Sequence, residues 1–208
     1  MGLFTRQYTS LPHTLLWPCL CRRLVVFSVD HRVQEWGHHF LRLTHLQDLD
    51  LKGDSSIYDS TAFSLPVEIG QLRTLKRLTL LNLPIDFPAW IANLSNLRYL
   101  VVRGTNLTTI PSWIHQLSRL HTLRVENCDL TVLPKTLRGM NNLRELGLGD
   151  TRLRDFSPEQ FPPQLRSLNF VGSGCWRRSD LRQLQRALPG TKVHPDPDHP
   201  AFCGRAEQ

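Results

Sequence analysis

The pattern L-x-x-L-x-L recurs along most of the 208-residue chain, and it restricts the possible folds more than any other feature. Five clear copies start 22 or 23 residues apart, at Leu75, Leu97, Leu120, Leu143 and Leu165. Two weaker copies, at Leu46 and at Leu188-Thr191-Val193, extend the series in both directions. These copies predict seven short strands, each with its apolar residues on one side. One such unit cannot cover its own apolar side, so neighbouring units must stack.

Each strand is followed by a return segment with its own pattern. A second apolar row comes first, at Ile85, Leu107, Leu130 and Leu153. The return then reads P-x-x-I-x-x-L from Pro66, Pro88 and Pro111, and P-x-x-L-x-x-M from Pro134. Proline suits the first position of a helical turn, and apolar residues three apart put one face of that turn against a core. Period and patterns together are typical of leucine-rich repeats, which predicts an α/β solenoid with a curved parallel sheet on the concave side and short helical or 3-10 returns on the convex side.

The remaining segments flank this array. The expected division is an extension of uncertain role over 1–28, an N-terminal cap over 29–45, repeats over 46–193, and a disordered tail over 194–208. The repeats should end in a capping helix over 179–188, with Ser179 as the N-cap residue. Its residues Leu181, Leu184 and Leu188 are expected to face the core.

Membrane, secretory and metal-binding signals are weak in this sequence. The most apolar segment, Leu15 to Val29, is split by Arg22 and Arg23 and falls short of the roughly 18 residues that cross a bilayer. It also lacks the features of a secretory signal, so we expect a cytosolic protein without a membrane span. The five cysteines are odd in number and mostly scattered, which favours free thiols. Cys19-x-Cys21 has no matching second pair, so neither a metal nor a cofactor is expected.

Cys128 is the one candidate nucleophile, because Asp129 follows it and some bacterial ubiquitin ligases with leucine-rich repeats use a cysteine near an aspartate. The repeat register favours a structural role instead. Thr105, Cys128, Thr151 and Ser173 occupy equivalent places beyond the strands, where such side chains satisfy backbone groups of the turn. A catalytic thiolate needs exposure and a basic partner. We therefore expect no catalytic residue and a non-enzymatic function.

The non-leucine positions of the strands face the concave side, in columns whose neighbours lie about 4.8 Å apart. The first column is mainly cationic and contains Gln47, Lys76, Arg98, His121, Arg144 and Arg166. An acidic partner would relieve its repulsion, although basic residues are also common at this consensus position. Nucleic-acid binding is not expected, because acidic residues are interspersed and Tyr99 is the only aromatic residue of these columns.

The middle of the concave face is the preferred binding site. It mixes an aromatic residue, arginines, acids and an exposed aliphatic residue, a composition typical of protein-binding surfaces. The candidate residues are Arg77, Tyr99, Val101, Arg103, Arg124, Glu126 and Glu145. They predict a protein partner and leave the oligomeric state open. Trp90 and Trp113, at equivalent places in two returns, are expected to stack along the convex wall, with an exposed apolar patch as the alternative.

Two longer stretches carry a family resemblance. "LRYLVVRGTNLTTIPSWIHQLSRLHTL" and "LRTLKRLTLLNLPIDFPAWIANLSNLRYL" resemble repeats of plant disease-resistance proteins and of type III-secreted effectors from plant-pathogenic bacteria. "FLRLTHLQDLDL", Phe40 to Leu51, resembles the opening of the repeat domain in effector ubiquitin ligases. There the repeats present a substrate, while a separate C-terminal domain recruits the conjugating enzyme.

The expectation is therefore a binding module, delivered into a host cell if the chain is a bacterial effector. The alternative is the substrate-recognition part of a ubiquitin ligase whose catalytic domain is absent or supplied in trans.

Overall fold

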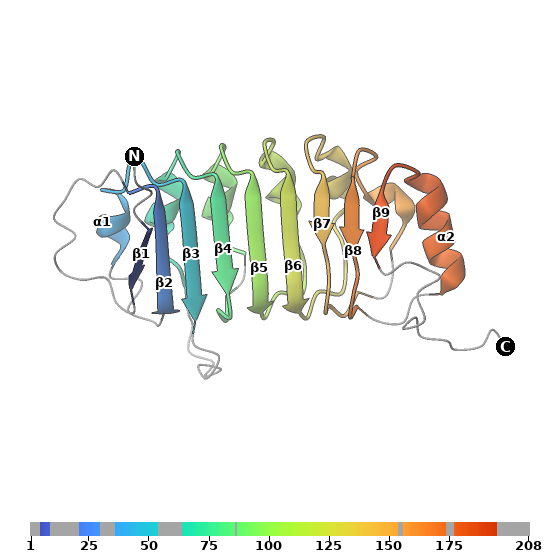
Figure 1. The fold of residues 1–208 in the computed structure, drawn as a ribbon, viewed down its shortest axis with the longest axis horizontal. Coiled ribbons are helices and arrows are strands. Elements are labelled where there is room, and N and C mark those ends of the chain that lie inside the picture. Colours follow the sequence, from blue (N-terminus) through green and yellow to red (C-terminus); the bar gives the residue numbers. More distant parts are fainter. Residues whose placement is uncertain are drawn as a thin grey trace.

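Nine parallel strands form one open, curved sheet in the computed structural model, and their order in space is their order in the sequence (Figure 1). The structure describes residues 5–8, 21–29, 36–53, 64–85, 87–153, 156–173 and 177–194. The strands are β1 (Thr5–Tyr8), β2 (Arg23–Val29), β3 (Asp48–Gly53), β4 (Arg77–Leu81), β5 (Tyr99–Thr105), β6 (Thr122–Cys128), β7 (Glu145–Gly147), β8 (Ser167–Asn169) and β9 (Lys192–His194). The predicted solenoid is confirmed.

Short helices return the chain behind the sheet (Figure 1). They are α1 (Gly37–Phe40), the 3-10 helices η2 (Val67–Gln71), η3 (Ala89–Asn93), η4 (Ser112–Gln116), η5 (Lys135–Gly139) and η6 (Pro158–Gln160), and α2 (Arg178–Ala187). In the part of the chain that the structure describes, no helix is long and apolar enough to cross a membrane.

The repeated prolines lie one position before the first helical residue that the sequence pattern assigned to them. Pro66, Pro88, Pro111 and Pro134 are the N-cap residues of η2 to η5 rather than their first helical residues. At Pro88, for example, φ is −67° and ψ is 134°, so the backbone is still extended. The fixed φ of proline suits both conformations, and the sequence could not tell which ψ follows.

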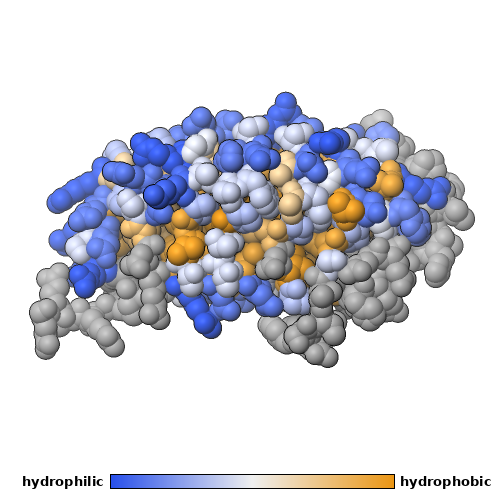
Figure 2. Space-filling model, turned by 180° about the vertical axis from the view of Figure 1, so that it is seen from behind, coloured by the Kyte–Doolittle hydropathy of each residue, from blue (hydrophilic) through white to orange (hydrophobic). Residues whose placement is uncertain are grey.

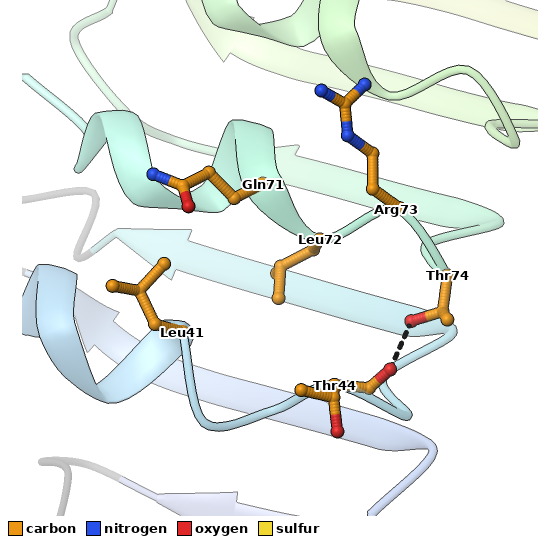
Figure 3. A pocket seen from close by; sticks show the side chains of 6 residues that line it. All are labelled: Leu41, Thr44, Gln71, Leu72, Arg73 and Thr74. Carbon is orange, nitrogen blue, oxygen red and sulfur yellow. Dashed lines mark hydrogen bonds between the residues drawn. The ribbon is translucent and has the colours of Figure 1, made fainter.

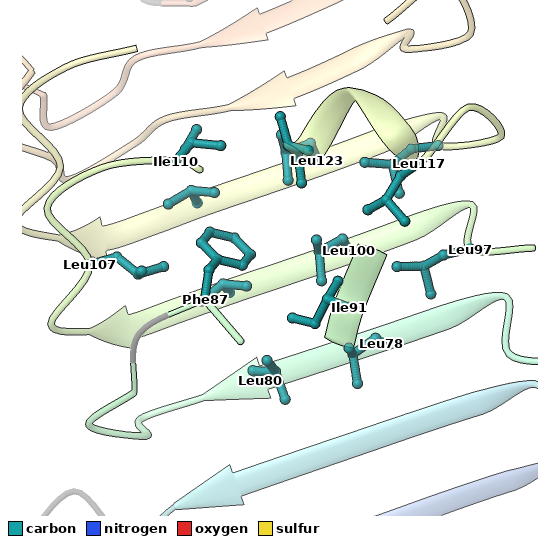
Figure 4. Close-up of a cluster of buried hydrophobic side chains, with 14 of the residues drawn as sticks. Leu78, Leu80, Phe87, Ile91, Leu97, Leu100, Leu107, Ile110, Leu117 and Leu123 are labelled. Carbon is teal, nitrogen blue, oxygen red and sulfur yellow. The ribbon is translucent and has the colours of Figure 1, made fainter. Parts of the chain in front are cut away.

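The core lies between the sheet and the returns, as the repeat pattern predicts. The middle leucines of successive strands, Leu78, Leu100 and Leu123, are fully buried. The second apolar row is buried behind them, and Figure 4 shows Phe87, Ile91 and Leu107 packed among these strand residues. Each such side chain contributes roughly 1.5–3 kcal/mol by leaving water, so the array is held mainly by this continuous apolar layer.

The seven predicted strands are β3 to β9, and two more precede them. β1 and most of β2 lie in the segment 1–28, which the sequence placed outside the repeats, so the start of the array was predicted too late. The register pairs Leu24 with Leu49 and Val26 with Leu51, so β2 continues the buried apolar rows. The signal was missed because Cys21, three residues before Leu24, stands where the clear copies of the pattern have their first leucine.

The structure describes only part of the expected N-terminal cap but the whole C-terminal capping helix. The expected N-terminal cap contributes α1, which packs against η2, while residues 30–35 lie outside the described part. At the other end, α2 buries Leu181, Leu184 and Leu188 as predicted. Its N-cap residue is Arg177 instead of Ser179, and no side chain caps the helix, so the position of its first turn is set by packing. The predicted tail lies outside the described residues, apart from His194 in β9.

One left-handed residue occupies the same place in each of five repeats, as the second-last residue of β5 and β6 and just beyond β4, β7 and β8. These residues are Asn82, Gly104, Asn127, Asp150 and Gly172, with φ between 50° and 77°. Glycine, asparagine and aspartate tolerate this conformation better than other residues. The Asn82 Oδ1 atom occupies the space beside Gly104 that a side chain would need, and Asp150 Oδ1 does the same at Gly172.

Candidate functional site on the concave face

The strand register brings the seven predicted binding residues together on one face. Arg77 is paired with Tyr99, Val101 with Arg124, and Arg103 with Glu126. Glu145 is paired with Thr122 of β6, which places it one strand beyond Arg124. Val101 and Glu126 are half-buried and the other five are exposed. We call these seven residues the central patch. Their common location is shown, whereas their role in binding remains a prediction.

The aromatic residue of the central patch is held by a cation. The Cζ atom of Arg77 lies 4.2 Å from the centroid of the Tyr99 ring, an attractive cation–π geometry. Arg77 Nε is in turn 3.6 Å from Asp48 Oδ1 on β3. Tyr99 still exposes 36% of its surface, so it is both accessible and oriented.

The acidic side of the central patch is built across β6 and β7. Arg124 Nη2 lies 4.0 Å from Glu145 Oε2, and the Thr122 hydroxyl donates a 3.3 Å hydrogen bond to the same oxygen. Beside them Gly147 has no side chain. A Cβ there would lie 2.6 Å from Glu126 Oε1 and 2.9 Å from Arg124 Cγ, so both side chains lean over β7.

The sequence analysis missed several contributors to this face. Asp48 orients Arg77, and the buried Asp50 forms a 3.0 Å ion pair with Arg23 of β2. Arg23 was missed because β2 itself was missed. Val171, just beyond β8, exposes 56% of its surface and adds an aliphatic group. Val171 has the same repeat position as Arg103 and Glu126, and this was the available signal.

Cys128 has the structural surroundings that the register predicts. It is only 8% exposed, and burial raises the pKa of its thiol; a backbone hydrogen bond with Leu130 opposes this shift, and the nearby Asp129 carboxylate adds to it. A buried thiol with a raised pKa is a poor nucleophile.

Thr151 and Ser173, at the places equivalent to Cys128 in the next two repeats, form hydrogen bonds with buried backbone groups. The Thr151 hydroxyl donates to the Leu148 carbonyl oxygen at 2.9 Å, and Ser173 Oγ accepts from the Thr151 N–H at 3.2 Å. The Ser173 hydroxyl also donates to the Leu148 carbonyl. Thr151 and Ser173 thus act as the register predicts, whereas the expectation is wrong for Thr105, whose buried Oγ1 has no hydrogen-bond partner.

A family model described as Leucine Rich Repeat matches residues 96–117, which contain β5 and η4. The chain has the leucine-rich-repeat fold. An internalin (inlF) from Listeria monocytogenes has a similar structure, with 18% sequence identity over 83% of this chain and 47% of that chain, and a TM-score of 0.60. A comparison with curated protein sequences gives no match.

A second similar structure comes from Arabidopsis thaliana. It is the leucine-rich-repeat ectodomain of the plant membrane receptor kinase GASSHO1/SCHENGEN3 in complex with CASPARIAN STRIP INTEGRITY FACTOR 2. The identity is 18% over 82% of this chain and 19% of that chain, and the TM-score is 0.57. The leucine-rich-repeat protein thus spans less than half of the internalin and about a fifth of the ectodomain. At these identities the likeness shows the fold.

The convex tryptophans of the leucine-rich-repeat protein belong to its wall. Trp90 is buried and lies against Gly70, where a Cβ would be 2.9 Å from Trp90 Cβ. Trp113 is half-buried and meets the edge of the Phe87 ring, with centroids 5.9 Å apart. The expected packing along the convex wall is therefore confirmed for both residues, and they form no exposed patch.

Two hollows lie away from the central patch. A pocket of about 230 Å³ is lined by Leu41, Thr44 and residues 71–74 (Figure 3). The Thr74 hydroxyl donates a 3.0 Å hydrogen bond to the Thr44 carbonyl at its side. A second, open hollow of about 940 Å³ lies between η5 and η6, with Val132 and Phe156 among its walls. The described residues contain no group of three or more His, Cys, Asp and Glu that could hold a metal, and Cys19 lies outside them.

Proposed function

We propose that this leucine-rich-repeat protein is a non-enzymatic module that binds a protein partner through the central patch. The observation that carries the proposal is the exposed Tyr99 ring, held by Arg77 in the middle of a preformed sheet. Aromatic residues and arginines dominate the energetics of protein interfaces. A side chain that is already oriented loses less conformational entropy on binding, so more of the contact energy appears as affinity.

The charges of the central patch favour a protein over a uniform polyanion. Arg103 and Arg124 lie beside Glu126 and Glu145, so a partner must present both signs in a matching arrangement. Such complementarity selects among partners and orients them. The complex of the Arabidopsis ectodomain supports a binding role for the fold, but it does not identify the partner of this chain.

A pulldown from cell extract tests the proposal. The intact chain is compared with a central-patch variant, Tyr99→Ala with Arg103→Glu and Arg124→Glu. A matched control carries Val67→Ala with Arg178→Glu and Arg182→Glu, which are exposed residues outside the concave face. Both variants should fold, because neither changes a buried residue, and the central-patch variant should unfold at most a few degrees lower because it loses the contact between Arg77 and Tyr99.

We expect a protein that the intact chain and the control recover and that the central-patch variant loses. With the purified partner, loss of one anchor should cost roughly 2 kcal/mol, about 30-fold in Kd. Equal recovery by all three chains would show that the concave centre is not the binding surface.

Two sequence-based hypotheses stay predictions. A ligase role would appear as ubiquitin-chain formation with a conjugating enzyme, and the burial of Cys128 indicates that its thiol would not be the nucleophile. A cytosolic location is tested by fractionating cells that express the chain.

A further inference from the structure

A second charged surface runs along the edge where the strands begin. The turns that lead into β4 to β8 lie at the upper edge of the sheet in Figure 1, and this edge is hydrophilic from behind as well (Figure 2). Their residues 72–76, 94–98, 117–121, 140–144 and 162–166 include no aspartate or glutamate. They do include Arg73, Lys76, Arg98, Arg119, His121, Arg144 and Arg166, which we call the cationic edge.

Backbone hydrogen bonds place these turns directly beside one another. The Arg98 N–H donates to the Lys76 carbonyl at 2.8 Å, and His121 N–H donates to the Arg98 carbonyl at 2.8 Å. Arg144 and Arg166 continue the series with bonds of 2.8 and 2.7 Å. Five rungs at the spacing of a sheet, about 4.8 Å each, extend over roughly 19 Å. The positive charges therefore form a line instead of scattered points.

Neutral groups hold several of these cations in place. Arg73 Nη1 donates to the Asn93 carbonyl at 2.7 Å, and Lys76 Nζ donates to Gln47 Oε1 at 3.0 Å. Such acceptors orient a cation without cancelling its charge.

The same holds further along the edge. Arg119 donates to the side-chain oxygen of Asn96, and Arg144 Nη1 donates to the Asn141 carbonyl at 2.9 Å. The next column inward differs, because Arg77 there lies beside the Asp48 carboxylate. The cationic edge is thus oriented but electrically uncompensated, and adjacent like charges favour an anionic occupant.

We propose that the cationic edge binds an extended acidic peptide segment, through carboxylates that meet its arginines and lysine. This inference goes beyond the proposed function and does not rest on the central patch. Arginine and carboxylate form strong, charge-assisted hydrogen bonds. An extended chain presents alternate side chains to one face, so a narrow acidic segment can follow the line of cations.

The surroundings favour a peptide over a nucleic acid. The turns of the cationic edge contain no Phe, Tyr or Trp on which bases could stack, and stacking is a main source of affinity for single strands. Just inside the edge, the Asp48 and Glu145 side chains are 36% and 50% exposed. Their carboxylates would repel the phosphates of a broad duplex, whereas a peptide can stay on the edge.

Fluorescence anisotropy with a defined probe tests this inference on the full chain. The probe is a labelled peptide of about ten residues with glutamate at alternate positions, which puts its carboxylates on one side when extended. The edge variant carries Lys76→Gln, Arg98→Gln and Arg166→Gln. Among the described residues the Arg98 and Arg166 side chains hold no hydrogen bond, so their replacement leaves the turns intact. We expect the edge variant to bind about tenfold more weakly than the intact chain.

A matched variant separates position from net charge. Arg178→Gln, Arg182→Gln and Arg186→Gln remove the same charge from exposed residues of α2 and should change the affinity less than about twofold. Equal weakening of both variants, or no binding of the peptide to the intact chain at low salt, would overturn the proposal.

Two further measurements identify the occupant and the surface. A single-stranded oligonucleotide of the same charge should bind no better than the peptide, and tenfold tighter binding through the same residues would show that the partner class is wrong. The central-patch variant loses more positive charge than the variant with Arg178, Arg182 and Arg186 replaced by glutamine. After allowance for this difference in net charge, the two variants should bind the peptide within about threefold of each other. Loss of peptide binding in the central-patch variant alone would place the site on the central patch and contradict the inference.

Discussion

The guanidinium of Arg77 lies 4.2 Å above the ring of Tyr99, and the two residues are register partners on adjacent strands. This pair joins the cationic and aromatic parts of the central patch before any partner arrives. The contact is partly exposed, so its energy can be measured in the free protein without disturbing the core.

A double-mutant cycle should detect this contact. Arg77→Ala, Tyr99→Ala and the double variant are unfolded in urea, and the coupling energy is expected at about 0.5–1 kcal/mol, as for other exposed cation–π pairs. The distant pair Arg77→Ala with Arg178→Ala should be additive. Additive values for Arg77 and Tyr99 would mean that the contact does not stabilise the folded chain.

The left-handed glycines should resist replacement. Gly104→Ala and Gly172→Ala each introduce a Cβ at positive φ, toward Asn82 Oδ1 and Asp150 Oδ1 respectively. We expect each to lower the free energy of unfolding by about 1–3 kcal/mol, measured by urea denaturation.

Gly139 provides the control for these glycines. Apart from Gly139 and its two neighbours in the chain, no residue has an atom within 4 Å of the position that its Cβ would take. Gly139→Ala should be neutral or stabilise the fold by up to about 1 kcal/mol. Similar losses for all three alanine variants would remove the conformational explanation.

Ser173 should contribute through a buried hydrogen bond. Ser173→Ala leaves the buried Thr151 N–H without its 3.2 Å acceptor, so a loss of about 1–3 kcal/mol is expected in thermal and urea unfolding. Ser118→Ala changes an exposed serine and should cost less than about 0.5 kcal/mol. A neutral Ser173→Ala would indicate that another group replaces the acceptor.

Cys128 should react slowly in the native protein. Burial raises the pKa of its thiol, so the folded chain favours the neutral form, and its contribution to stability is present at neutral pH and is lost as pH rises through the folded-state pKa. Iodoacetamide labelling at about pH 8, followed site by site with mass spectrometry, should be slow in buffer and fast in urea. Equally fast labelling in both solvents would contradict the buried, protonated state.

The leucine pattern predicts the fold well because it reports directly on burial. Leu100 and Leu123 are paired on adjacent strands, and both are buried. Once the buried positions of each repeat are known, the positions of the strands, the returns and the concave face can be predicted from them. β2 escapes this reasoning, since Leu24 and Val26 fill the same layer but the buried Cys21 stands at the first place of the pattern, where the clear copies have leucine. β2 nevertheless pairs on both sides, with β1 and with β3, so its place in the sheet is that of an interior strand.

The candidate site was predicted in position but not in detail. Register alone places Arg77 beside Tyr99, whereas the stacking of one on the other depends on side-chain rotamers and on Asp48. Likewise, the lean of Glu126 over β7 follows from the missing side chain of Gly147. The pattern of apolar residues carries no information about such contacts between polar side chains.

Every strand bonds only to those adjacent to it in the sequence, from β1 to β9. The array therefore needs no closure, unlike a barrel, and its length is not fixed by geometry. Duplication of one unit, such as residues 97–119, would insert one more rung and move the ends apart by a single strand spacing, about 4.8 Å. Selection can thus adjust the reach of this surface in whole units by recombination, without redesigning the layer of leucines beneath it.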